Sequence, residues 1–221
     1  MTGGLMKPLF ITLFLLAFLA IPLKNPEARP VSYPDGWTAM TKHNGDIHSF
    51  HLHYSPTAKY SIGPRVEYRR GPEYTMTTMQ LNNLLKRWNN PGSQANLYLK
   101  SGLGWADSNA GANKGKSSPA GFTGLAADWE NRRYFVSYEN RVIEAGDVDD
   151  RFSQKVMVGI APYIGDYGDL HTWLMLELEH EPEDADKYTL RPHVRFFKGV
   201  HLLEAGISDQ NNVIFNYILR F

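Results

Sequence analysis

Charged residues alternate with apolar residues along several segments of the sequence, and these charges carry the clearest hint of chemistry. Side chains two residues apart on a β-strand share a face, so each set would line one face of a sheet. Charges of both signs on one face either pair with each other or line a passage for ions and small solutes. The candidate pore-lining residues are Arg65, Glu67, Glu177, Glu179, Arg191, His193, Arg195 and Glu204.

Two neighbouring segments predict specific ion pairs. Glu177 and Glu179 would face Arg191 and Arg195 across a hairpin closed by residues 181–186. Glu204 would lie on the other side of Arg195. Removing one partner of a buried pair leaves the other charge uncompensated, so a structural function explains the pairs as well as a selectivity lining does. Both interpretations stay open at this point.

Histidines offer an alternative chemistry. His51 and His53 share a strand face, and His171 and His193 fall on predicted faces of the same kind. Imidazole is the commonest protein ligand for zinc and copper, so the alternative is a metal-binding or metal-handling barrel. The chain has no cysteine that could add a ligand, and polar lining explains the histidines equally well. We expect no cofactor.

Catalytic motifs are weak. A hydrolase or acyltransferase needs a serine beside a histidine and an orienting polar group. Ser49 and Ser137 are available, but no Gly-X-Ser-X-Gly sequence is present. The run 102–106 is not followed by the Lys-Ser/Thr of a phosphate loop. A lipid-modifying membrane enzyme is therefore a third alternative, and we expect the protein not to be an enzyme.

Turn residues divide the chain into about twelve strands, with ten as the fallback. Asn44-Gly45 is a strong hairpin signal. Residues 77–88 are compatible with a helix but also alternate, so we expect a strand there. The expected strands are Trp37–Lys42, Asp46–Ser55, Lys59–Arg69, Tyr74–Trp88, Ala95–Trp105, Gly121–Trp129, Arg133–Ile143, Phe152–Tyr163, Leu170–His180, Tyr188–Phe197, His201–Ile207 and Asn212–Phe221.

Four of these strands separate cleanly into an apolar and a polar face. The apolar sets are Phe50, Leu52 and Tyr54; Tyr60, Ile62, Pro64, Val66 and Tyr68; Leu174, Leu176 and Leu178; and Tyr188, Leu190, Pro192, Val194 and Phe196. A barrel in lipid has its apolar face outward, whereas a soluble β-protein has the same alternation with the apolar face inward. The matched charges favour the first arrangement. Pro64 and Pro192 are unfavourable in interior strands and count against this register.

The last ten residues identify the class of barrel. Val213, Phe215, Tyr217, Leu219 and Phe221 form one apolar and aromatic face. Through Tyr217, Leu219 and the terminal Phe221, the segment resembles the closing strand of a bacterial outer-membrane β-barrel. The resemblance implies an all-β, antiparallel, up-and-down transmembrane barrel in a Gram-negative outer membrane. Its implied partners are outer-membrane lipid and the barrel-assembly machinery.

The lengths of the connections test the strand count. In such barrels the turns on the periplasmic side are short and the external loops are longer. The two longest expected connections, 107–119 and 181–186, are the fifth and the ninth, and both fall on the external side. We expect every connection on the other side to be short. This parity favours twelve strands.

The amino terminus looks like a targeting segment. Lys7 precedes an apolar run over 8–23, which is typical of a secretory signal peptide. We expect a signal peptide over 1–28, cleaved after Ala28 or Ala20, and one barrel domain over 29–221. An uncleaved anchor is the alternative. With 23 basic and 23 acidic residues, the chain lacks the basic excess that a nucleic-acid partner requires.

These observations predict an integral outer-membrane barrel. Twelve strands enclose a narrower lumen than the 16–18 strands of general porins. The expected function is a narrow channel or a structural barrel for small polar or charged solutes.

Overall fold

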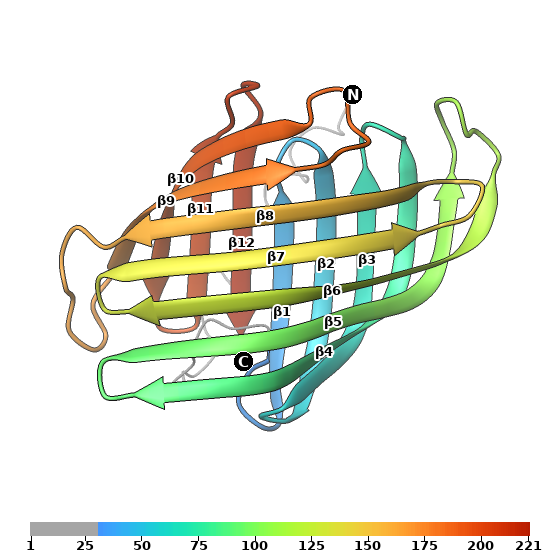
Figure 1. Cartoon of the computed structure of the whole chain (residues 1–221). Coiled ribbons are helices and arrows are strands. Elements are labelled where there is room, and N and C mark those ends of the chain that lie inside the picture. Colours follow the sequence, from blue (N-terminus) through green and yellow to red (C-terminus); the bar gives the residue numbers. More distant parts are fainter. Residues whose placement is uncertain (1–30) are drawn as a thin grey trace, which may run out of the picture.

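The computed structural model describes residues 31–221, which form a single closed antiparallel β-barrel (Figure 1). The expected signal peptide, residues 1–28, lies outside the described residues and stays a prediction. Within residues 31–221 no helix is long and apolar enough to cross a membrane.

Each strand pairs with its neighbours in the sequence, and β1 pairs with β12. The prediction of twelve strands is confirmed and the ten-strand fallback is wrong. Residues 77–88 lie in a strand, as expected. The strands are β1 (Gly36–His43), β2 (Ile47–Thr57), β3 (Tyr60–Arg69), β4 (Tyr74–Asn90), β5 (Ser93–Ser108), β6 (Ser117–Asn131), β7 (Tyr134–Glu144), β8 (Asp150–Ile160), β9 (His171–His180), β10 (Tyr188–Lys198), β11 (His201–Ile207) and β12 (Val213–Arg220).

The carboxy-terminal residue takes part in closing the barrel. The Trp37 backbone N–H donates to the Phe221 carbonyl (2.7 Å), and the Phe221 N–H donates back to Trp37 (3.0 Å). Six further residue pairs join β1 to β12. Closure leaves no open sheet edge, so the strands satisfy one another's backbone groups even in a solvent that cannot hydrogen-bond.

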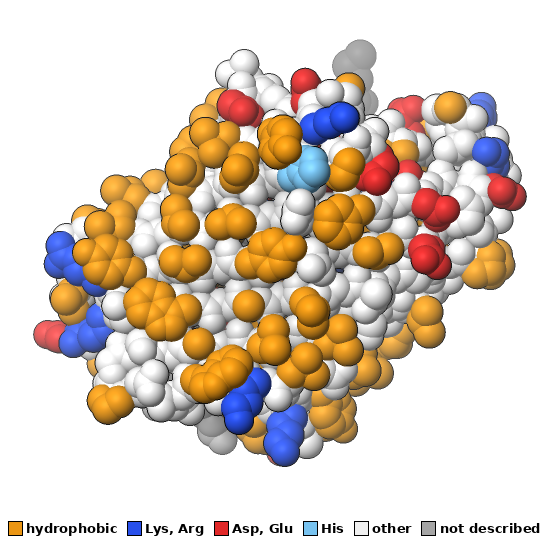
Figure 2. All heavy atoms as spheres, viewed as in Figure 1, with side chains coloured by type: hydrophobic (Ala, Val, Ile, Leu, Met, Phe, Trp, Pro, Cys, Tyr) orange, Lys and Arg blue, Asp and Glu red, His pale blue; other side chains and the backbone are white. Residues whose placement is uncertain are grey.

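The faces separate as the alternation predicts. On β9, Leu174, Leu176 and Leu178 point outward and are 42–51% exposed, whereas Glu177 and Glu179 point inward and are buried. The assignments on β2, β3 and β10 agree as well. Figure 2 shows apolar side chains across the face that β5–β9 present, with charged side chains gathered toward its ends.

Both prolines that counted against the register fit it. Pro64 and Pro192 are exposed on the outer face, and they lie opposite Met79 and Leu176 in the ladders. The predicted register therefore holds around them.

Exposed aromatic side chains lie near both ends of the barrel. We call the end that carries Phe221 and the connection 91–92 the turn end, and the end that carries the connections 109–116 and 181–187 the loop end. Two such belts are typical of the two water–lipid interfaces of a membrane barrel. The aromatic residues are Trp37, Tyr60, Trp88, Trp129 and Tyr134 at the turn end and Tyr68, Trp105 and Tyr188 at the loop end.

Two expectations about the connections are wrong. The turn-end connection between β8 and β9 covers residues 161–170 and is longer than any loop-end connection. Strand β8 ends at Ile160, not at Tyr163, because Pro162 has no N–H to donate to a ladder. Conversely, the expected loop 107–119 shortens to 109–116, since β5 and β6 stay paired from Asp107–Ser117 onward.

Candidate functional site

All eight predicted lining residues point into the barrel. Glu67, Glu177, Glu179, Arg191, His193 and Glu204 are buried, and Arg65 and Arg195 are partly buried. Their placement agrees with the predicted inner face. Whether they line a pathway for solutes stays a prediction.

The ion pairs agree with the sequence in part. Arg191 donates to Glu177 (3.2 Å), to Glu179 and to Asp46 (2.7 Å). Arg195 binds Glu204 (2.7 Å) on β11, as predicted. The predicted contact of Arg195 with the β9 glutamates is wrong. The hairpin register places Arg195 opposite Trp173, two inward-facing positions from Glu177 toward the turn end.

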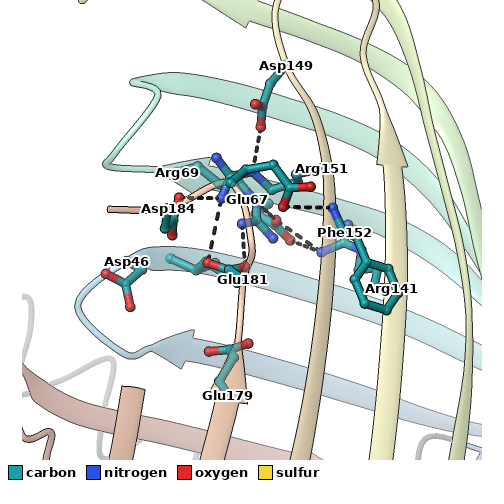
Figure 3. A network of polar contacts seen from close by, with 12 residues as sticks. Asp46, Glu67, Arg69, Arg141, Asp149, Arg151, Phe152, Glu179, Glu181 and Asp184 are labelled. Carbon is teal, nitrogen blue, oxygen red and sulfur yellow. Dashed lines mark hydrogen bonds and ion pairs between the residues drawn. The ribbon is translucent and has the colours of Figure 1, made fainter. Parts of the chain in front are cut away.

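At the loop end, charged side chains from strands and loops form two adjoining networks, which together we call the outer cluster (Figure 3). Its carboxylates and guanidinium groups are largely buried and satisfy one another. Its members are Asp46, Glu67, Arg69, Arg141, Asp149, Arg151, Glu179, Glu181, Asp184 and Arg191.

Glu67 on β3 is central in the outer cluster. It accepts hydrogen bonds from Arg65, from Arg69 (2.9 Å) and from Arg141 (2.8 Å). Its side chain is fully buried, so three guanidinium groups replace its water shell. Charge-assisted contacts of this kind are strong, and breaking one leaves buried charges uncompensated.

Loop residues anchor the connections to the barrel wall. Arg151 binds Asp149 (2.7 Å) and Asp184 (3.0 Å), and Arg69 binds Glu181 (3.1 Å). Glu181 lies just beyond β9 in the loop 181–187. Burial raises the pKa of Glu181 to about 7, while Arg69 acts in the opposite direction. This carboxyl therefore changes charge near neutral pH.

An apolar cluster fills the other half of the loop end. Phe122 belongs to it and lies under the Arg141 guanidinium, 3.9 Å from the ring centroid. This cation–π contact joins the apolar cluster to the outer cluster. Together they occupy the interior at this level. The apolar residues are Tyr74, Met76, Ala106, Ala120, Phe122, Ile143, Ala145 and Val148.

Below this level the interior contains two open spaces beside a small buried apolar cluster of Val31, Tyr98 and Ala126. A vestibule of about 600 Å³ reaches the turn end, where Gly92 and Arg132 line it. An inner cavity of about 240 Å³ extends toward Arg69 and Arg141. Lys100 and Lys155 line both spaces, so the two are contiguous. Among residues 31–221, the lumen is thus open at the turn end and filled by side chains at the loop end.

The four candidate histidines do not form one site. The rings of His51 and His53 are 6.0 Å apart on β2. His193 lies near Glu204 (3.8 Å), and His171 lies beside Phe197 near the turn end. Within residues 31–221, no three His, Asp or Glu residues form a group that could hold a metal ion. The described residues therefore provide no ligand set for the alternative of a metal-binding barrel.

Sequence reasoning missed the inward charges of β1, β5, β7 and β8. Lys42, Lys100, Glu139, Arg141 and Lys155 all line the inner cavity. The same alternation could have found them. Lys155, for instance, alternates with exposed Val156 and Val158.

Comparisons with known proteins give only distant similarity. No protein-family model and no curated protein matches the chain. Among solved structures, the chain is similar to the KdgM porin in complex with disordered oligogalacturonate (10% identity, 84% of this chain and 98% of that chain, TM-score 0.48). It is also similar to OccAB4 of Acinetobacter baumannii (13%, 92% and 68%, 0.40) and OccK8 (OprE) of Pseudomonas aeruginosa (6%, 84% and 62%, 0.43). At these scores, neither the fold nor the solute of those proteins is transferred to this chain.

The assignment to a membrane rests on the molecule itself. Its barrel is closed, its outer surface is apolar between two aromatic belts, and its interior is charged. This inside-out distribution is the one that a β-barrel needs in lipid. The predicted outer-membrane β-barrel is confirmed in these features.

Proposed function

We propose that the protein is a narrow outer-membrane channel for small polar or charged solutes. One observation carries the proposal: the vestibule and the inner cavity form a continuous charged lumen along much of the barrel. A barrel with a purely structural function needs no such hollow, because side chains can fill a small barrel completely.

Passage requires movement at the loop end. The outer cluster and the apolar cluster occupy the barrel there, so a solute has to displace side chains or loops. We place the opening of the loop end at Arg191, because this residue joins Asp46 in the connection 44–46 to Glu177 and Glu179 on β9. We therefore propose that the resting state conducts weakly.

Planar bilayer recording of the purified full-length protein tests this proposal. We expect small, infrequent conductance steps from the native protein. Arg191→Ala should give larger or more frequent steps, and both Arg191→Ala and Glu177→Ala should change the ion selectivity. The matched control is Arg133→Ala, which removes an exposed arginine at the turn end.

A folded native barrel and a folded Arg191→Ala barrel that both fail to conduct would refute a channel. Folding is checked by the shift in gel mobility on boiling. We also propose outer-membrane lipid and the barrel-assembly machinery as partners, and we propose that the protein is not an enzyme. The proposed partners follow from the apolar outer surface and from the closing strand β12.

A further inference from the structure

Three lysines meet inside the barrel although their strands are far apart around the wall. Lys42 is on β1, Lys100 on β5 and Lys155 on β8, and all three line the inner cavity. Lys100 and Lys155 also line the vestibule, so they lie where the two spaces join.

The carboxylates at this level do not balance the three lysines. Glu139 binds Lys100 (2.9 Å) and lies 3.9 Å from Lys155. Glu177 lies 3.6 Å from Lys155 but is shared with Arg191. Lys42 forms no ion pair within 4.0 Å in the described part of the chain, although the charges of Glu177 and Glu179 act on it, and its side chain contacts Lys155.

The whole lining of the inner cavity has the same imbalance. Glu67 does not line the cavity but binds three of its arginines. Cations still outnumber carboxylates when Glu67 is included in the count. The cations are Lys42, Arg65, Arg69, Lys100, Arg141, Lys155 and Arg195, and the carboxylates are Glu139, Glu177, Glu179 and Glu204.

A contact between two ammonium groups in a confined lumen is unfavourable, because little water screens it. An anion between them would remove this repulsion. Each ammonium group has three donors on a flexible stem and suits an oxyanion of variable orientation.

We propose that a small oxyanion of the phosphate or carboxylate type binds in the inner cavity between Lys42 and Lys155, with Lys100 at its entrance. The vestibule gives access from the turn end. The inference deepens the proposed channel and rests on it for its biological meaning, since the site makes the solute an anion.

Equilibrium dialysis of radiolabelled inorganic phosphate tests the site without requiring conductance. The purified full-length barrel is kept in detergent micelles at low salt, and unlabelled acetate is the second probe. We expect saturable phosphate binding that weakens as salt is added. Lys42→Met should weaken it about tenfold or more, as expected for a lost hydrogen bond between charged groups.

Two further variants sharpen the test. Lys42→Arg keeps the charge and should retain most of the binding. Lys187→Met makes the same change as Lys42→Met on an exposed loop lysine and should bind like the native protein. Displacement by acetate identifies a general oxyanion site, whereas resistance to acetate identifies a site for phosphate.

Two results would overturn the site: no saturable binding to the folded native barrel, or equal losses in Lys42→Met and Lys187→Met. Neither result bears on conductance. Conversely, phosphate binding by a barrel that never conducts would leave the site standing and refute the channel.

Discussion

The outer cluster and the inner cavity share Arg69, Arg141 and Glu179 and contain charges of both signs, yet only the inner cavity contains lysines. All four cations of the outer cluster are arginines, namely Arg69, Arg141, Arg151 and Arg191. The three lysines of the lumen are all in the inner cavity. A guanidinium group binds carboxylates in a fixed fork, whereas an ammonium group is a mobile point charge.

Burial follows the same division. Glu67, Arg69 and Arg191 are 0–2% exposed, whereas Lys42, Lys100 and Lys155 are only partly buried beside open space. The arginine network therefore holds the loop end together, and the lysines remain available to a solute. The difference predicts that mutations in the outer cluster change stability and that mutations in the inner cavity change binding.

The largest effect should come from Glu67→Gln. The variant leaves Arg65, Arg69 and Arg141 without their shared carboxylate, and breaking a buried pair costs about 3–5 kcal/mol. Urea unfolding in lipid vesicles, followed by tryptophan fluorescence, measures this loss. Glu144→Gln changes an exposed carboxylate and should have little effect. Equal stability of the two variants would contradict the claim that the outer cluster stabilises the fold.

The stability of the loop end should also depend on pH. A carboxyl with a higher pKa in the folded protein binds its proton more tightly when folded. The stabilisation is fully present below the ordinary pKa of 4.5 and is lost as the pH rises through about 7. The free energy of unfolding at pH 5 and at pH 8 should differ by about 2–3 kcal/mol from Glu181 alone. Glu181→Gln should reduce this difference, and an unchanged pH profile would contradict the account.

A smaller effect is expected where the apolar cluster meets the outer cluster. Phe122→Leu keeps an apolar side chain but removes the ring under Arg141. The expected loss is about 1 kcal/mol, the range of a partly desolvated cation–π contact. Leu103→Ala on the exposed outer face is the control in detergent. A larger loss from the control would mean that the contact with Arg141 contributes little.

The smallest stability effect should come from Lys42→Met. Lys42 has no ion-pair partner within 4.0 Å in the described chain, and the like charges of Lys155 and Arg191 oppose the attraction of Glu177 and Glu179. The free energy of unfolding should stay within about 0.5 kcal/mol of the native value or rise. A loss as large as that of Glu67→Gln would show that Lys42 is a structural cation after all.

The sequence predicts strand faces well because the period of two is local. Arg191 and Glu177 face each other because a single hairpin register joins them. The partner of Arg195 was only half predicted, since Trp173 and not a glutamate lies opposite it. The register of a hairpin depends on where its strands end, and alternation does not give that position.

Contacts between strands that are not neighbours cannot be predicted from the alternation of residues along each strand. Arg141 reaches Glu67 from β7 to β3, and Glu181 reaches Arg69 from a loop. Such pairs depend on the size of the closed barrel and on loop paths. The proximity of Lys42 to Lys155 has the same origin, so the inner cavity could be described only from the structure.

Cysteine reactivity tests most directly whether one end of the lumen is open and the other closed. The native chain has no cysteine, so single variants give an unambiguous signal. Ser137→Cys places a thiol in the vestibule, and Thr189→Cys places one at the buried loop-end level.

The rates at which the two thiols react with a small charged thiol reagent are compared in lipid nanodiscs, where both ends of the barrel are accessible. We expect Ser137→Cys to react faster by an order of magnitude, and we expect Arg191→Ala to remove the protection of Thr189→Cys. Equal rates at the two positions without Arg191→Ala would contradict a closed loop end.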